Sequence, residues 1–338
     1  MTSRIVKARP PRRRFSVVND KFPFVRVEGK TINEARPKRR NSAPATQDTD
    51  VFLTFTSLCC AGEALQPMGK VNQDDHVEIP NFDGNSSNRL FIVMDGHGVN
   101  GHLVSKMLKE RLPPLFLAEW EKNPVLKPAL ASAFRKMNEE LINSSIDCSL
   151  SGSTCTLVLI LQNTIYTANV GDSRVIVGSF RNGKWSAKPL SDDHKPNRPD
   201  EWDRIVEAGG RIEPLCCRSN EFIGPPRVWL PSILLPGLAM SRSMGDTIAA
   251  SVGVSSEPEF VDYTLSVDDK FIILATDGVW EFLSNDEAVE IVTPFYIAND
   301  IERACDNIVK ESFVRWETSE GAADDITCTI IFIKHSKK

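Results

Sequence analysis

The chain has 338 residues, of which 41% are hydrophobic, and a formal net charge of −5 at pH 7. This length is enough for one large domain or two small ones. No run of about 18 apolar residues occurs and the start has no apolar signal-peptide core, so we expect no membrane span. The eight cysteines include no Cys-x-x-Cys repeat, which favours reduced intracellular thiols over disulfides or a zinc site.

The net charge hides a division between the first 42 residues and the rest. Residues 1–42 contain 13 Lys/Arg and three acidic residues, about +10, which leaves about −15 for the remainder. An acidic body argues against nucleic acid as a partner. Five prolines interrupt any helix in residues 1–48, so we predict a basic, largely flexible extension whose simplest interpretation is a solvated tail. Within it, the apolar segment 22–27 could dock on the body as an extended piece.

After the extension, strand-like and helical segments alternate. Residues 51–58 are rich in β-branched and aromatic residues and predict a strand. Apolar residues recur with helical spacing over 102–112, and Pro113-Pro114 predicts the end of that helix. The same spacing over 130–141 predicts a second helix.

The second half of the chain begins with a predicted hairpin, in which strands 154–161 and 164–170 are joined at Gln162-Asn163. Strand pairs joined by short turns, with helices grouped in pairs, favour an α+β fold of antiparallel sheets covered by helices. The remaining predicted elements are a short helix over 202–208 ended by Gly209-Gly210, a long proline-containing loop over 211–236, a helix after the capping-box spacing of Ser284 and Glu287, a helix over 299–316 and a strand over 326–333.

Four aspartates stand at the ends or starts of apolar strand-like runs. Asp95, Asp172 and Asp277 each follow such a run, and Asp324 comes just before the last one. A single Asp-Gly is usually a turn. Several carboxylates delivered to strand ends instead suggest a site for hard divalent cations, which prefer oxygen ligands.

The same residues carry a family resemblance. Seven motifs occur in order over residues 52–335, and together they resemble the metal-dependent protein phosphatases of the 2C type, the PPM family. The motifs are Val71-Asn72-Gln73-Asp74, Met94-Asp95-Gly96-His97-Gly98, Ser151-Gly152-Ser153-Thr154, Gly171-Asp172-Ser173-Arg174, Leu238 to Asp246, Ala275-Thr276-Asp277-Gly278-Val279-Trp280 and Asp324-Asp325-Ile326-Thr327. The resemblance implies a four-layer α-β-β-α sandwich over residues 49–338, with a metal site at one mouth between the two sheets.

The resemblance also implies the metal ligands. Asp95 would bridge two cations, and Gly96 would offer its carbonyl oxygen to one of them. Asp277 and Asp324 would hold the other, and Asp172 would contribute with Asp277 to a weaker third position. Carboxylate oxygens suit Mg²⁺ or Mn²⁺ rather than Zn²⁺.

Two further residues are expected to act at the metal site. Asp74 would act through waters around the cations, although a turn or cap residue is the alternative. His97 would stand at the rim of the site and donate a proton to the departing serine or threonine oxygen. A buried structural histidine is the alternative for His97.

Three positions depart from the usual family pattern. Gln73 stands where glutamate is commoner, and it can still hydrogen-bond a water. Gly69 falls at the position of the family's phosphate-binding arginine, and the adjacent Lys70 would act only as a point charge. Asp325 replaces a more usual asparagine and leaves Asp324 intact.

The sequence therefore predicts a hydrolase that removes phosphate from phosphoserine and phosphothreonine in proteins, using a water activated by a two-metal centre. Residues 211–236, with Arg227, match the flap beside the family's catalytic cleft and would contact the phosphoprotein substrate. The alternative is a catalytically inactive pseudophosphatase that binds phosphoproteins. A nuclease is disfavoured by the acidic body.

We also state expectations for the oligomeric state, the location and the phosphorylation of the enzyme. We expect a monomer, located in the cytoplasm or the nucleus, with organelle targeting by the basic extension as an open alternative. Ser16 and Ser42 each end an Arg-Arg-x-Ser sequence that basophilic kinases accept. Such short motifs are also frequent by chance.

Overall fold

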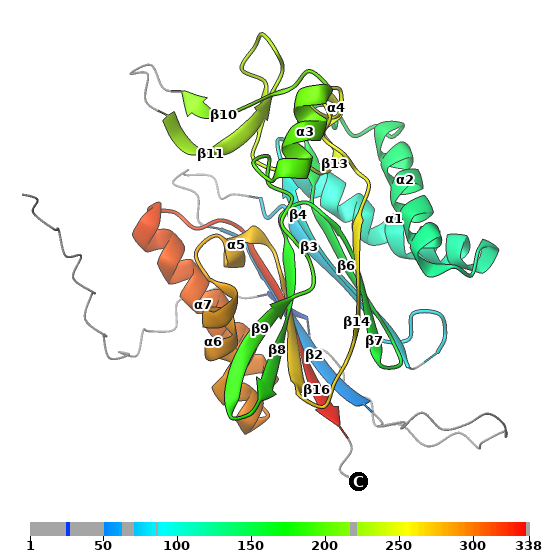
Figure 1. Cartoon of the computed structure of the whole chain (residues 1–338), viewed down its shortest axis with the longest axis vertical. Coiled ribbons are helices and arrows are strands. Elements are labelled where there is room, and N and C mark those ends of the chain that lie inside the picture. The colour runs from blue at the N-terminus through cyan, green and yellow to red at the C-terminus, as the bar shows by residue number, and fades with distance from the viewer. Residues whose placement is uncertain (1–24, 28–50, 63–70, 86, 217–221, 336–338) are drawn as a thin grey trace, which may run out of the picture.

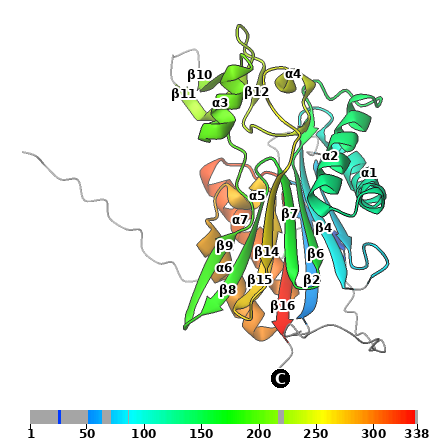
Figure 2. The ribbon, with the colours of Figure 1, turned by 45° about the vertical axis from the view of Figure 1, so that its right-hand side comes forward.

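Two β-sheets packed face to face between two pairs of helices form the body of the molecule (Figures 1 and 2). The computed structural model describes residues 25–27, 51–62, 71–85, 87–216 and 222–335. Helices α1 (Gly101–Lys122) and α2 (Leu126–Ile142) cover one outer face. Helices α6 (Asn285–Ala298) and α7 (Ile301–Ser319) cover the other. The predicted four-layer sandwich is therefore confirmed.

Both sheets are antiparallel throughout their named strand pairs. The first has the order β1 (Val25–Val27), β2 (Val51–Cys60), β16 (Ile326–His335), β15 (Asp269–Ala275), β8 (Arg174–Arg181) and β9 (Lys184–Pro189). The second has the order β13 (Met244–Gly245), β5 (Gly152–Ser153), β4 (Asn88–His97), β6 (Cys155–Leu161), β7 (Thr164–Val170) and β14 (Glu259–Thr264), and β3 (Asp74–Ile79) pairs with β4.

Side-chain alternation along the strands separates the layers. On β4, Leu90, Ile92 and Met94 pack in the cluster beneath α1 and α2. The intervening Phe91 and Val93 pack in the cluster between the two sheets. Each of these side chains is completely buried, and burial of one such side chain stabilises the fold by about 1.5–3 kcal/mol. The strand period of two thus fixes which face each residue serves.

Most predicted elements are confirmed. The hairpin of β6 and β7 turns at Gln162, which has a positive φ of 55°. The capping box of Ser284 and Glu287 is formed at the start of α6. The short helix is α3 (Pro199–Glu207), and two further helices are α4 (Thr247–Ala250) and α5 (Asp277–Trp280). No helix in the described ranges is long and apolar enough to cross a membrane.

The predicted end of the first helix at Pro113-Pro114 was wrong, because α1 continues through both prolines to Lys122. Prolines remove the hydrogen bonds to the carbonyls four residues earlier. Those carbonyls belong to the exposed residues Lys109 and Glu110, where water can satisfy them. Beyond the prolines, the fully buried Phe116 continues the apolar stripe into the core. Packing therefore outweighs the local preference to stop.

The predicted loop over 211–236, which we call the flap, was also wrong in its structure. It contains β10 (Arg211–Cys216) and β11 (Phe222–Trp229), which form a three-stranded sheet with β12 (Pro236–Leu238). The pairing of β10 with β11 shifts register between Glu213 and Leu215. Pro214, Pro225 and Pro226 all fall in this irregular stretch, where no ladder N–H is needed.

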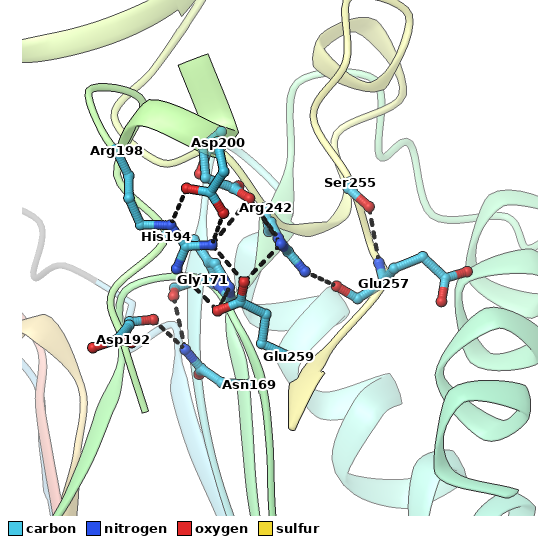
Figure 3. Close-up of polar contacts among 12 residues, drawn as sticks. Asn169, Gly171, Asp192, His194, Arg198, Asp200, Arg242, Ser255, Glu257 and Glu259 are labelled. Atoms are coloured by element: carbon cyan, nitrogen blue, oxygen red, sulfur yellow. Dashed lines mark hydrogen bonds and ion pairs between the residues drawn. The ribbon is translucent and has the colours of Figure 1, made fainter. Parts of the chain in front are cut away.

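A network of carboxylates and arginines joins the start of α3 and the segment after the flap to β14 (Figure 3). Asp200, Glu201 and Glu259 bring carboxylate oxygens within 4.8 Å of one another. All three accept hydrogen bonds from Arg198, and Arg242 also donates to Glu201 and Glu259. Because guanidinium groups already neutralise these carboxylates, the cluster is an ion-pair network rather than a cation site.

Glu201 is the buried centre of this network, with a relative exposure of 0%. Burial raises its pKa, but hydrogen bonds from Arg204, Arg242 and Ser241 outweigh that effect and lower the pKa to about 2. A carboxyl group with a depressed pKa contributes stability at neutral pH, and that contribution is lost as the pH falls toward the folded-state pKa.

We expect Glu201→Gln to flatten the acid dependence of folding stability. In the wild type, ionised Glu201 contributes about 3 kcal/mol of folding stability, which is lost as the pH falls from the unfolded-state pKa near 4.3 to about 2. Urea unfolding of both proteins at pH 7, 5, 4 and 3 measures it. The exposed Glu121→Gln in α1 is the control and should follow the wild-type curve. Parallel curves for Glu201→Gln and the wild type would contradict the assignment.

Candidate metal centre

Acidic residues from both sheets meet at one mouth of the sandwich. Asp74 and Asp95 are direct cross-strand partners on β3 and β4. Asp277 follows β15 as the first residue of α5, and Asp324 lies two residues before β16. A hydrogen bond of 2.9 Å from Thr276 Oγ1 to Asp74 Oδ2 links the two sheets at this point.

The backbone of β4 is held tightly where it carries Asp95 and Gly96. Asp95 exchanges two hydrogen bonds of 2.9 Å with Thr154, through its N–H to Thr154 Oγ1 and through its carbonyl to the Thr154 N–H. A Cβ at Gly96 would lie 2.5 Å from the Gly101 carbonyl oxygen and 2.6 Å from that of Gln73. Only glycine allows this approach of three backbone segments.

The carboxyl groups here are buried close together, as their pKa values indicate. Burial and then the neighbouring carboxylates of Asp277 and Asp74 raise the pKa of Asp95 well above its usual range. Burial, followed by Asp172 and Asp324, raises the pKa of Asp277 to about 7. For Asp74, burial and the Asp325 carboxylate raise the pKa against the hydrogen bonds that it accepts. Without compensating positive charge, such a cluster destabilises the ionised form.

These residues fit a site for hard cations. Asp74 Oδ1, Asp172 Oδ1 and Asp277 Oδ1 are buried and have no hydrogen-bond partner within the described part of the chain. Buried carboxylate oxygens usually find a donor or a metal. Oxygen donors without Cys or His among them match the chemistry of Mg²⁺ or Mn²⁺.

His97 lies at the end of β4 and is paired with Asp246. Its Nε2 is 2.6 Å from Asp246 Oδ2, and its side chain is 23% exposed. Burial lowers the pKa of His97, but the Asp246 carboxylate outweighs it and the net direction is upward. The imidazole is therefore a partly accessible group hydrogen-bonded to a carboxylate, which favours its protonated form.

Asp172 follows β7 and is 2% exposed. Its Oδ2 is 2.5 Å from Lys195 Nζ, and its charge raises the pKa of Asp277. Asp172 therefore lies beside the other carboxylates, and the Lys195 ammonium group compensates the charge on one of its oxygens.

The atypical Asp325 has a structural task at the mouth. Its two carboxylate oxygens accept hydrogen bonds of 2.7 Å from the Gly62 N–H and 2.9 Å from the Gln73 N–H. The Gln73 side chain donates from Nε2 to the Gly98 carbonyl at 2.7 Å. In this arrangement Gln73 supports the loop that carries His97 and Gly98.

The remaining predicted site residues are placed elsewhere or not at all. Arg227 lies in β11, and its Nη1 donates to the Gly237 carbonyl at 2.7 Å, so this contact stays within the flap. Lys70 lies outside the described residues. The sequence argument gave no role to Asp246, Thr276 and Lys195. Asp246 and Thr276 stood in quoted motifs, which was a usable signal, whereas Lys195 gains its partner only in three dimensions.

Comparisons with known proteins identify the family. The family model for protein phosphatase 2C matches residues 60–319. "Probable protein phosphatase 2C 35" of Arabidopsis thaliana is 36% identical over 302 residues, covering 83% of this chain and 84% of that protein. "Probable protein phosphatase 2C 72" of the same plant is 33% identical over 289 residues, covering 80% and 84%.

A solved structure shares the fold. The crystal structure of a serine-threonine phosphatase 2C from Toxoplasma gondii matches with a TM-score of 0.72 and 21% identity, covering 92% of this chain and 99% of that one. Sandwich and sequence together define a metal-dependent serine/threonine protein phosphatase. The chain belongs to the protein phosphatase 2C family.

We expect Asp277→Asn to stabilise the protein when divalent cations are removed and to weaken its response to them. Neutralising one of several buried carboxylates relieves repulsion, so the melting temperature in EDTA at pH 8 should rise by about 2–4 °C. On addition of Mn²⁺, the melting temperature of the wild type should rise more than that of the variant.

The control is Asp203→Asn, an exposed position on α3. It should behave as the wild type in EDTA and in Mn²⁺. A lower melting temperature of Asp277→Asn in EDTA, with an undiminished Mn²⁺ response, would contradict the placement of Asp277 among the ligands.

Proposed function

We propose that this phosphatase hydrolyses phosphoserine and phosphothreonine in proteins with a centre of two divalent cations held by Asp95, the Gly96 carbonyl, Asp277 and Asp324. The observation that carries the proposal is the group of buried carboxylates contributed by both sheets, with oxygens that lack partners in the described chain. Mg²⁺ or Mn²⁺ bound there would neutralise phosphoryl charge and activate a water. A weaker third cation would take Asp172.

The protein's own groups supply the remaining steps. His97 would give a proton to the departing alkoxide, and Asp246 would favour the protonated imidazole and hold the ring in place. Asp74, fixed by Thr276, would accept hydrogen bonds from waters at the centre. Lys195 offers positive charge beside Asp172 in a chain that has Gly69 at the family's arginine position.

A phosphoprotein is the substrate class that the surface beside the centre favours. The flap exposes large apolar side chains, including Leu215 at 40%, Phe222 at 66% and Ile223 at 53%. Exposed apolar groups gathered on one element are typical of surfaces that contact other proteins. The flap would therefore bind substrate through apolar contacts, with Arg227 fixed beneath by Gly237.

The decisive experiment is hydrolysis of a phosphothreonine peptide by the purified protein in Mn²⁺, in Mg²⁺ and in EDTA. We expect turnover with either cation and none in EDTA. Turnover that EDTA leaves unchanged would exclude the mechanism. Peptide binding without turnover under all three conditions would instead support the pseudophosphatase alternative.

His97→Ala should lower the maximal rate on alkyl phosphates by about 10²–10⁴-fold. The loss should be smaller on an aryl phosphate, because its leaving group needs little protonation. Asp246→Asn should show the same preference with a smaller loss. Equal losses on both substrates would indicate that His97 is structural.

The basic extension is proposed to regulate this activity. Ser16 and Ser42 lie outside the described residues. Residues 1–42 carry about +10 and the remainder about −15. An unmodified extension would therefore be attracted to the acidic body, and phosphate added by a basophilic kinase would weaken that attraction.

Deleting residues 1–48 should therefore raise phosphopeptide turnover at low ionic strength and have little effect at high ionic strength, where charges are screened. Phosphopeptide turnover of the truncated and the full-length protein is measured over a salt series from about 20 to 500 mM NaCl. If turnover and its salt dependence are unchanged, the extension is a spacer or a targeting segment.

We also propose that the protein is a monomer and that it is located in the cytoplasm or the nucleus.

A further inference from the structure

The turn that carries Asp172 is held by a completely buried histidine, His194. The His194 imidazole accepts a hydrogen bond at Nδ1 from the Gly171 N–H at 3.0 Å. The His194 backbone N–H donates to the Gly171 carbonyl at 3.1 Å. One residue thus binds both polar groups of the glycine directly before Asp172 (Figure 3).

Gly171 needs such support because of its backbone. Its φ is +103°, a conformation that is open to glycine and strained for other residues. A glycine turn is also flexible when its hydrogen bonds are lost. The position of the Asp172 carboxylate therefore depends on the groups that fix Gly171.

On the far side of the imidazole, the Glu259 carboxylate lies at ion-pair distance, outside hydrogen-bond geometry. Because Nδ1 accepts the Gly171 hydrogen, the ring proton of the neutral imidazole is on Nε2. Nε2 lies 3.1 Å from Glu259 Oε2. Glu259 is itself fixed, since Arg198 donates to its Oε2 at 2.9 Å and Arg242 to its Oε1 at 3.0 Å.

The residue after His194 completes the arrangement. Lys195 contacts Asp172 Oδ2, whereas Asp172 Oδ1 is buried without a hydrogen-bond partner in the described chain. His194 therefore fixes the backbone of the turn, Lys195 fixes one side-chain oxygen, and the other oxygen is left available for a cation.

We propose that His194, paired with Glu259, is the positioning residue that holds Asp172 in place for the third, weaker divalent cation. This inference rests on the proposed function, because it needs the cation position at Asp172. It links the ion-pair network around Glu201 and Glu259 to the metal centre through the chain Glu259–His194–Gly171–Asp172. Carboxylates that orient a histidine behind a metal site contribute to metal affinity in the same way.

The test is a Mn²⁺ titration of the full-length protein. Binding is monitored by calorimetry and by the electron paramagnetic resonance of free Mn²⁺. We expect His194→Ala to weaken the weakest Mn²⁺ site about 10–100-fold and to leave the tighter binding unchanged. Asp172→Asn should lose the same weakest site. Glu259→Gln keeps an oxygen for His194 Nε2, so its loss should be smaller than that of His194→Ala.

A matched control separates positioning from general loss of stability. Thr167 in β7 donates to the Leu190 carbonyl at 2.7 Å, so Thr167→Val removes a buried hydrogen bond between the same two segments without touching Gly171. This control should leave all Mn²⁺ affinities unchanged. Weakening by Thr167→Val as large as that by His194→Ala would overturn the inference.

The tautomer gives an independent readout that needs no variant. In protein labelled with ¹⁵N-histidine, His194 should show a protonated Nε2 and an unprotonated Nδ1. A protonated Nδ1, or an unchanged weakest site in folded His194→Ala, overturns the inference while leaving the proposed function standing. A wild type that binds no Mn²⁺ at all would overturn both.

Discussion

Concentrated negative charge in a buried place is the constraint on which this structure depends. Asp95, Asp277 and Asp74 stand together at the mouth of the sandwich, and their pKa values are raised by burial and by one another. Ionised carboxylates in such a place are costly unless positive charge joins them. The protein supplies a little of that charge through Lys195, and in the proposed function divalent cations at the unpartnered oxygens supply the rest. The same cost would then favour cation binding.

A rigid scaffold is needed to keep like charges close. Three apolar clusters, one between the sheets and one under each helix pair, hold the two sheets in fixed relation. The short bonds across the mouth, from Thr276 to Asp74 and from Gly62 and Gln73 to Asp325, then tie one sheet to the other. The apolar layers provide the stability, and the polar contacts decide the positions of the carboxylates.

The flap is built differently from the sandwich. It is a small three-stranded sheet with proline-filled irregular pairing and exposed apolar side chains. Ile212, Val228 and Leu238 of this sheet pack with α3 and α4 in an apolar cluster separate from those of the sandwich. Because the clusters are separate, the flap can vary without disturbing the layers beneath it. Under the proposed function, catalysis takes place at the strand ends and recognition at the flap.

The sequence by itself determined antiparallel strands covered by helices and the acidic residues at the strand ends, because strand alternation, helical spacing and Asp-Gly after apolar runs are local signals. The order of the four layers came from the family resemblance. The sequence could not determine that α1 passes through Pro113-Pro114 or that the flap contains strands, because tertiary packing and register shifts override local preference there. Nor could it pair His97 with Asp246, or His194 with Gly171 and Glu259. Those contacts join residues 23 to 149 positions apart, and only the folded chain brings such distant groups within hydrogen-bond distance.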